Sequence, residues 1–255
     1  MSRSSRVVRL AAAGCVTLAL GGFLGARYVT TSRAQARRPA TEGVGYRPPG
    51  APVFELHVPH AKGSIVLDGD MDDPGWLRET ARTNAFLGED GVNPARPYSD
   101  ARLAWGDGHL YVALYAADEN ILATQTKSDE PLWTEDSFHL TFNDGANERV
   151  FDVSPLGTLT DGTRSANARP AKPFDYAWQS GAHVSKELDG TPNNPSDDDE
   201  EWVIEMAIPF EALGLKGEPG ERIGFSVRRC DTPKRSKRAC GSWGAQASAG
   251  VLVLD

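Results

Sequence analysis

Residues 101–119, ARLAWGDGHLYVALYAADE, are the stretch that decides the fold. They contain two apolar segments joined by Gly-Asp-Gly at residues 106–108, the residue types that a tight hairpin turn requires. Successive side chains of a strand point to opposite faces, so Leu110, Val112 and Leu114 should share one buried face. The stretch therefore predicts an antiparallel hairpin that covers a core.

The remainder of the chain repeats this pattern, with short apolar segments separated by turn residues and with little helical periodicity. The predicted strands include SIVLDG (64–69), SFHLTF (137–142), ERVFDVSPLGTLTDG (148–162), AWQSGAHVSKELDG (177–190), EWVIEMAIPF (201–210), RIGFSVRRCD (222–231) and GVLVLD (250–255). One short helix is expected at PFEALGL, residues 209–215. Many short strands with turn signals predict an all-β fold, an antiparallel β-sandwich of the jelly-roll or immunoglobulin-like kind.

One predicted strand begins in an unusual way, within PLWTEDSFHLTF at residues 131–142. Its apolar residues alternate as a core row, so His139 should point to the opposite face. Trp133 precedes the strand, either as a binding platform or as an aromatic that fills a loop. Asp136 is expected to hold the turn through backbone N–H groups.

The N-terminal 36 residues have the pattern of an export signal. Arginines precede the 17-residue apolar run Leu10–Ala26, and Ala34-Gln35-Ala36 offers a small-residue cleavage site. An uncleaved membrane anchor is the alternative, because such a run is at the lower limit of a spanning helix. Cys15 is followed by further apolar residues rather than a polar tether, so a lipoprotein is not favoured.

The sequence after this segment predicts a linker and one domain. Residues 37–52 are rich in proline and glycine and should form a tether. Residues 53–255 contain no second linker, so they should fold as a single unit. The protein is expected to be exported, whether to the periplasm, the extracellular space or an outward-facing membrane anchor.

Charge and cysteine usage fit an exported protein. The full chain has a net charge of −8, which becomes −13 when the five arginines of the first 36 residues are removed. So acidic a surface disfavours nucleic acid and anionic membranes as partners. Cys230 and Cys240 flank a basic loop, and an oxidising compartment should join them in a disulfide.

The order of motifs resembles the family 9 carbohydrate-binding modules, whose β-sandwich is related to DOMON-type domains. The motifs are VLDGDMDDPGW, LAWGDGHLYVALYAAD, LWTEDSFHLTFND, EEWVIEMAIPFEALGL, RIGFSVRRCD and GSWG. The resemblance covers residues 64–255 and implies a non-catalytic protein that binds a poly- or oligosaccharide beside glycoside hydrolases in polysaccharide catabolism. A sugar's apolar C–H face stacks on indole, and its hydroxyls need directed partners.

The resemblance also implies where the sugar would bind. The first stacking tryptophan of the family falls on Trp133, and three of its polar positions fall on His139, Asp152 and Arg228. The family's second stacking tryptophan has no equivalent here, and Trp178 is the candidate for a second aromatic wall. The competing interpretation is that Asp152 and Arg228 form a salt bridge that only joins strands.

Other interpretations concern metals, cofactors and function class. Some family members hold calcium, and a cluster of acids offers carboxylate ligands for it: Asp68, Asp70, Asp72 and Asp73. The runner-up function is a DOMON-like haem or cofactor domain, which would use Met71 or Met206. A third is a structural or interaction module. No catalytic residues are predicted, because no motif singles out a catalytic pair.

Overall fold

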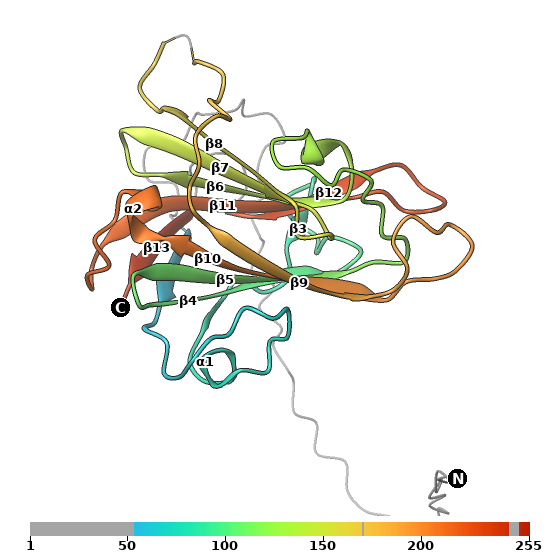
Figure 1. The fold of residues 1–255 in the computed structure, drawn as a ribbon, viewed down its shortest axis with the longest axis horizontal. Helices are drawn as coiled ribbons and strands as arrows, with labels where there is room; N and C mark the ends of the chain where they lie inside the picture. Colours follow the sequence, from blue (N-terminus) through green and yellow to red (C-terminus); the bar gives the residue numbers. More distant parts are fainter. Residues whose placement is uncertain (1–53, 170, 245–249) are drawn as a thin grey trace, which may run out of the picture. The chain divides into compact units, whose positions relative to one another are not determined.

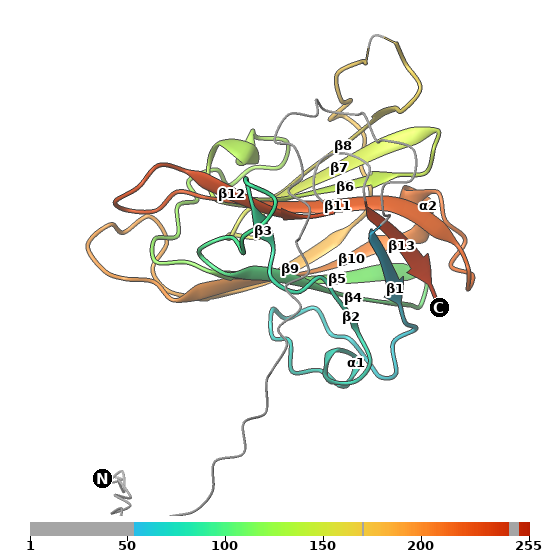
Figure 2. The same ribbon diagram turned by 180° about the vertical axis from the view of Figure 1, so that it is seen from behind.

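The structure of the protein is a computed structural model that describes residues 54–169, 171–244 and 250–255. It contains two β-sheets packed face to face (Figures 1 and 2). Sheet A consists of β1 (Phe54–Val58), β3 (Leu87–Gly88), β6 (Ser137–Asn143), β7 (Asn147–Val153), β8 (Leu159–Ser165), β11 (Arg222–Asp231), β12 (Ala239–Trp243) and β13 (Gly250–Leu254). Sheet B consists of β2 (Ala81–Arg82), β4 (Ser99–Gly106), β5 (His109–Ala117), β9 (His183–Asp189) and β10 (Glu201–Pro209).

The strand order confirms the predicted all-β sandwich. Sheet A runs β1-β13-β11-β6-β7-β8, with β12 bridging β11 and β3, and sheet B runs β2-β4-β5-β10-β9. The pairing is antiparallel except between β1 and β13, which are parallel and start with Phe54 opposite Gly250. The expected helix is α2 (Phe210–Leu213), and the structure adds α1 (Pro74–Leu77) and the 3-10 turn η1 (Leu132–Thr134), which had not been predicted.

The hairpin of β4 and β5 forms as predicted. Asp107 and Gly108 both have positive φ, +48° and +79°, as a type I′ turn requires. From that turn the two strands pair continuously to Ser99 opposite Ala116.

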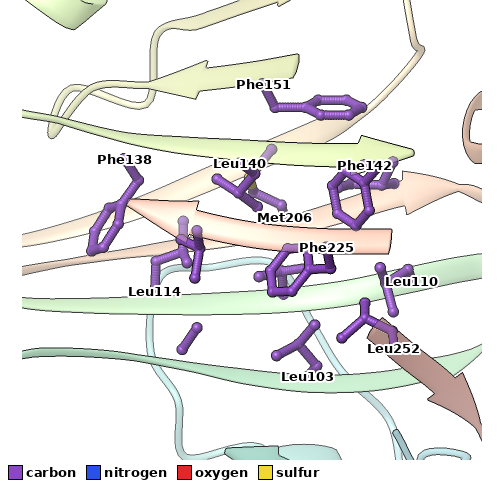
Figure 3. Packing of buried hydrophobic residues seen from close by; sticks show 14 of the residues in the cluster. Leu103, Leu110, Leu114, Phe138, Leu140, Phe142, Phe151, Met206, Phe225 and Leu252 are labelled. Atoms are coloured by element: carbon purple, nitrogen blue, oxygen red, sulfur yellow. The ribbon is translucent and has the colours of Figure 1, made fainter. Parts of the chain in front are cut away.

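The core lies between the inward rows of the two sheets. Figure 3 shows Phe138, Leu140 and Phe142 of sheet A approaching Leu114 and Met206 of sheet B. These five side chains are fully buried. Aromatic residues extend this contact, since the Phe138 ring meets the Trp202 ring edge-on at 4.9 Å. The predicted inward rows are therefore confirmed.

Residues 64–69 do not form the strand predicted for them. The buried carboxylate of Glu205 instead accepts the backbone N–H groups of Asp68 and Gly69, at 3.1 and 2.7 Å, and the indole N–H of Trp76, at 2.5 Å. Gly69 has φ +99°, and a Cβ there would lie 2.3 Å from the backbone of Lys186. The carboxylate of Glu205 thus accepts N–H groups that would bond to a neighbouring strand if this segment were in a sheet.

Asp136 joins three segments at one end of the sandwich. One carboxylate oxygen accepts the N–H of Leu122 at 2.7 Å, and the other accepts the N–H of Thr232 at 2.7 Å. The start of β6 is therefore tied to the loop after β5 and to the β11–β12 hairpin. The predicted role of Asp136 in holding backbone N–H groups is confirmed.

Beside Asp136, a buried arginine bridges two further acids. The guanidinium of Arg229 is only 3% exposed and donates to Asp118 and Asp231, each at 2.8 Å. Asp118 also accepts the indole N–H of Trp202 at 3.0 Å. The carboxylates of Asp118, Asp136 and Asp231 all lie within 4.8 Å of one another.

This crowding of buried acids perturbs their protonation. Burial raises the pKa of Asp136 to about 6, assisted by the charge of Asp118 and opposed by its backbone hydrogen bonds. Burial also raises the pKa of Asp231 to about 7, opposed by Arg229 and assisted by Asp118 and Asp136. The folded protein therefore binds protons that the unfolded chain releases at about pH 4.

We predict that the free energy of unfolding falls as pH rises from 5 to 8. In that window the folded state binds more protons than the unfolded state, so raising the pH favours unfolding. Asp231→Asn keeps an acceptor for Arg229 but does not titrate, so its melting temperature should change less between pH 5 and 8. Calorimetric melting of both proteins measures this, and equal pH slopes would contradict the account.

Candidate functional site

Three predicted site residues form one row across sheet A. In the strand register Arg228 of β11 lies opposite His139 of β6, and His139 lies opposite Asp152 of β7. Their neighbours Leu140 and Phe151 belong to the core, so this row lies on the outer face of the sheet. The structure thus brings His139, Asp152 and Arg228 together, as the sequence predicted.

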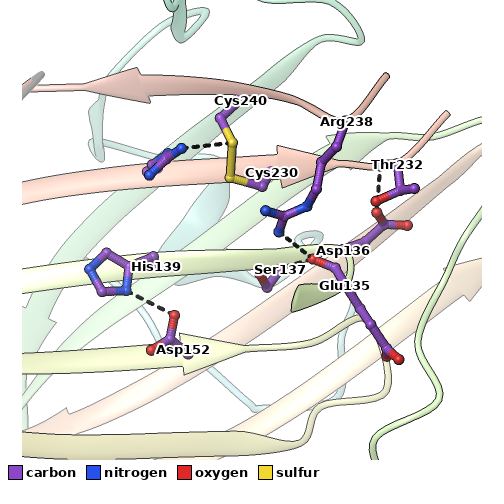
Figure 4. The surroundings of a disulfide bond; sticks show 10 residues. Glu135, Asp136, Ser137, His139, Asp152, Cys230, Thr232, Arg238 and Cys240 are labelled. Carbon is purple, nitrogen blue, oxygen red and sulfur yellow. Dashed lines mark hydrogen bonds and ion pairs between the residues drawn. A yellow bond between two sulfur atoms is a disulfide. The ribbon is translucent and has the colours of Figure 1, made fainter. Parts of the chain in front are cut away.

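Within the row, His139 rather than Arg228 pairs with Asp152. The imidazole Nδ1 lies 2.8 Å from the carboxylate of Asp152, a contact drawn as a dashed line in Figure 4. Nε2 lies 3.2 Å from the hydroxyl of Thr141. In the neutral ring Nδ1 donates to Asp152 and Nε2 accepts from Thr141. The Asp152 side chain is 1% exposed and that of His139 is 40% exposed, so the histidine presents this pair to solvent.

Arg228 has no acidic partner on this face. Its side chain is exposed, and one guanidinium nitrogen lies 2.9 Å from Cys240 Sγ. Across the described ranges, no carboxylate oxygen lies within 4.0 Å of the guanidinium. The salt bridge to Asp152 that would have explained both residues as structural is not formed.

The aromatic group on this side of the molecule is a stacked pair. Trp133 lies in η1 with 43% of its surface exposed, and its ring stacks on Tyr176 with a centroid distance of 5.8 Å and an interplanar angle of 27°. Burial raises the pKa of the Tyr176 hydroxyl, and the charge of Asp152 raises it further. The pair therefore lies within electrostatic reach of the polar row.

Local backbone features explain where Tyr176 lies. Gly162 of β8 lies under its ring, and a Cβ on Gly162 would come within 2.9 Å of it. Asp175 forms an isolated antiparallel bridge with Thr163, which holds the Tyr176 loop along the edge of sheet A. Tyr176 was not among the predicted site residues, although it lies two positions before Trp178 in the sequence.

The structure corrects the prediction that Trp178 supplies a second wall beside Trp133. The Trp178 ring packs against the core and meets Phe151 edge-on at 6.2 Å. Phe151 belongs to the inner face of sheet A, whereas Asp152 next to it belongs to the outer face. A turn at residues 176–177 separates the two aromatics, so Tyr176 takes the position expected for Trp178.

The β11–β12 hairpin borders the same face. Cys230 and Cys240 lie opposite each other in the register and form the predicted disulfide. At the hairpin's base, Arg238 donates to the backbone carbonyl of Glu135 at 2.7 Å (Figure 4). Glu135 is two residues after Trp133, so the hairpin and the tryptophan turn support each other. Residues 245–249, where the family's second tryptophan would be sought, lie outside the described residues.

The remaining described tryptophans pack in the interior or against it. Trp76, Trp105 and Trp202 are buried, and Trp243 packs against the core from a partly buried position.

The structure does not support the residues that the sequence offered as calcium or haem ligands. Among the described residues, the one group of three acids close enough to hold a metal ion is the Asp118 cluster, not residues 68–73. Arg229 already neutralises part of that cluster. Met206 lies in the main core and Met71 packs against a separate cluster around Trp76.

A cleft of about 560 Å³ lies elsewhere, along the edge between β8 and β9. Its lining includes Asp161, Gln179, His183 and Val184, together with residues of the loops before β8 and β9. None of Trp133, His139, Asp152 or Arg228 lines it. The cleft and the outer face of sheet A are therefore distinct candidate surfaces.

The fold has solved relatives. A candidate carbohydrate-binding protein from Bacteroides uniformis superposes with a TM-score of 0.61 at 15% identity, covering 80% of this chain and all of that one. A family 9 carbohydrate-binding module from Caldicellulosiruptor kristjanssonii, solved with cellotriose, gives 0.52 at 17% identity, covering 79% and 93%. The same module solved with glucose gives 0.52 at 18% identity, covering 78% and 95%.

At these identities the superpositions show a shared fold. Comparison with the curated proteins finds no match. The family assignment comes from the chain's own residues 67–250, which match the model of the carbohydrate family 9 binding domain-like family and make up most of the chain. The chain therefore belongs to the carbohydrate family 9 binding domain-like family.

Proposed function

We propose that this protein is an exported, non-catalytic carbohydrate-binding protein that holds a poly- or oligosaccharide on the outer face of sheet A. The observation that carries the proposal is the exposed Trp133–Tyr176 stack beside a row of polar side chains. The relatives solved with cellotriose and glucose support a sugar as the class of ligand.

The physical chemistry of the face suits a sugar. A pyranose has an apolar C–H face that can cover the exposed part of the Trp133 indole. The ring of Tyr176 stacks on the same indole and helps to hold it in place. The sugar ring's hydroxyls need donors and acceptors nearby: the hydroxyl oxygen of Thr141 can accept, and the exposed guanidinium of Arg228 in the same row can donate. Because Asp152 already orients His139, the polar groups are prepared before ligand arrives.

The wider role that we propose follows from the class of protein. A sugar-binding domain without its own reaction increases the local concentration of a partner on the same polymer. We therefore propose that the protein acts beside glycoside hydrolases that degrade polysaccharides. Export, through residues 1–36, would place it where such polymers occur, either released or held by that segment as a membrane anchor. In the described part of the chain, no helix is long and apolar enough to cross a membrane.

The first prediction of this proposal concerns Trp133. Trp133→Ala should weaken binding to the best ligand of a glycan array by roughly tenfold or more, because truncating an aromatic anchor typically costs about 2 kcal/mol or more. Its melting temperature should stay close to that of the parent, since the side chain is half exposed. Isothermal titration and calorimetric melting measure the two effects.

A matched control distinguishes the two candidate surfaces. Gln179→Ala alters the cleft between β8 and β9 and leaves the outer face of sheet A intact. We expect it to bind like the parent. Loss of binding in Gln179→Ala but not in Trp133→Ala would move the site to the cleft. If the parent binds no glycan at all, and Trp133→Ala melts at a much lower temperature, Trp133 is structural and the proposal fails.

The second prediction concerns export. Expressed from its own gene with residues 1–36 intact, the protein should leave the cytoplasm and begin after Ala36. Mass spectrometry of the mature N-terminus measures this. An exported protein that still begins at Met1 would support the anchor form, whereas an uncleaved protein in the cytoplasmic fraction would refute export.

A further inference from the structure

We propose that the site on sheet A selects acidic sugars, with Arg228 binding the carboxylate of a uronate residue in an oligosaccharide. The inference rests on the proposed function and narrows its substrate class. Its first support is the guanidinium of Arg228, which is exposed, lies in the register row of the site and has no carboxylate within 4.0 Å across the described ranges.

The acids nearest to this row already have other partners. Asp152 is bound by His139 at 2.8 Å. The Glu135 carboxylate accepts the N–H groups of Thr124 and Gln125, at 2.5 and 3.3 Å, so it is turned toward that loop. The buried Asp118 cluster is bridged by Arg229. The guanidinium of Arg228 is therefore available to an anionic group of a ligand.

Further positive charge lies in the hairpin between β11 and β12. Exposed basic residues occupy the hairpin between β11 and β12: Arg235, Lys237 and Arg238. Lys234 in the same hairpin is paired with Asp198, but none of these three forms a salt bridge with a described residue. Arg238 is oriented toward the site by its bond to the Glu135 carbonyl. Of these three cations, Arg238 is therefore the one that a contact places beside the site.

The charges of Arg228 and Arg238 repel each other. Burial lowers the pKa of Arg238, and the charge of Arg228 lowers it further, while Asp136 and Asp231 oppose the shift. An anion placed between the two guanidinium groups would relieve their repulsion.

The strand spacing indicates how many sugar rings the ligand needs. Arg228 is two strands from Asp152, so their Cα atoms are about 10 Å apart for strands spaced about 4.8 Å. The aromatic pair lies on the Asp152 side, since Tyr176 covers β8. A sugar ring stacked on the aromatic pair leaves Arg228 to the next ring of the same chain. We therefore infer an oligosaccharide, with one ring on Trp133 and a neighbouring ring that carries the charge.

A carboxylate fits this arrangement better than other anions. The planar guanidinium forms two parallel hydrogen bonds with a planar carboxylate. A uronate carries its charge at the edge of the ring, which leaves both ring faces free for stacking. Neighbouring rings of a polyuronate can therefore satisfy the aromatic pair and Arg228 together.

The test uses an oligogalacturonide and the same oligomer with its carboxyls methyl-esterified. These ligands differ in charge and share the same sugar rings. Parent, Arg228→Gln and Arg222→Gln are titrated calorimetrically with both. Arg222→Gln is the matched control because it removes the same charge from an exposed position of the same strand, where Arg222 pairs with Glu55.

We expect the parent to bind the acidic oligomer roughly tenfold or more tightly than its methyl ester, as charge-assisted bonds would produce. Arg228→Gln should lose this preference and Arg222→Gln should keep it. Added salt should weaken binding of the acidic form more than that of the ester. Equal affinity for the two oligomers, or a preference that survives Arg228→Gln, would overturn the inference.

Two further ligands show whether sugar rings and carboxylates are both needed for binding, and neutral glycans separate failure of the acidic preference from failure of the proposed function. Polyglutamate is a polyanion without sugar rings, and a sulfated galactan is an anionic sugar without carboxylates; either one binding as tightly as the uronate overturns the inference. If only neutral glycans bind, and Trp133→Ala removes that binding, the proposed function stands and the acidic preference fails. If neither acidic nor neutral glycans bind, the proposed function fails as well.

Discussion

The carboxylate of Asp136 is the constraint on which the site depends. It stands at the start of β6 and accepts backbone N–H groups from Leu122 and Thr232, so three segments meet at one buried charge. Arg229 holds Asp118 and Asp231 beside it. Burial in a group of like charges costs free energy, as the raised pKa of Asp136 records. The hydrogen bonds from Leu122 and Thr232 offset part of that cost. The same bonds hold the turn that carries Trp133 and the β11–β12 hairpin in fixed positions.

The sandwich allows this site because strand alternation separates two tasks. Inward residues such as Leu140 and Phe151 pack in the hydrophobic core, and their neighbours His139 and Asp152 face outward. A rigid core therefore supports the polar row. The aromatic pair comes from turns beside the sheet, where sequence can change without disturbing the ladder.

Local patterns account for what the sequence could predict. The β4–β5 hairpin followed from its turn residues and its alternation, and the row of His139, Asp152 and Arg228 followed from a family resemblance. The disulfide followed from two cysteines that flank a turn. Each of these predictions uses only residues that are close in the sequence, either along one strand or within one motif.

Contacts between distant segments account for what it could not predict. Residues 64–69 resemble a strand, but Glu205, more than 130 positions away, takes their N–H groups. Tyr176 replaced Trp178 because a turn reverses which aromatic faces outward. The absence of an Asp152–Arg228 pair depended on which of the two basic residues, His139 or Arg228, Asp152 would bind. None of these contacts between distant segments produces a periodic pattern in the sequence from which it could be predicted.

A crystal structure of the protein with a bound oligosaccharide tests the central claim most directly. The account predicts a sugar ring stacked on the exposed face of Trp133, with its hydroxyls toward His139 and the chain of rings extending across β6 toward Arg228. Density for the sugar in the cleft between β8 and β9, with the indole of Trp133 uncovered, would contradict it.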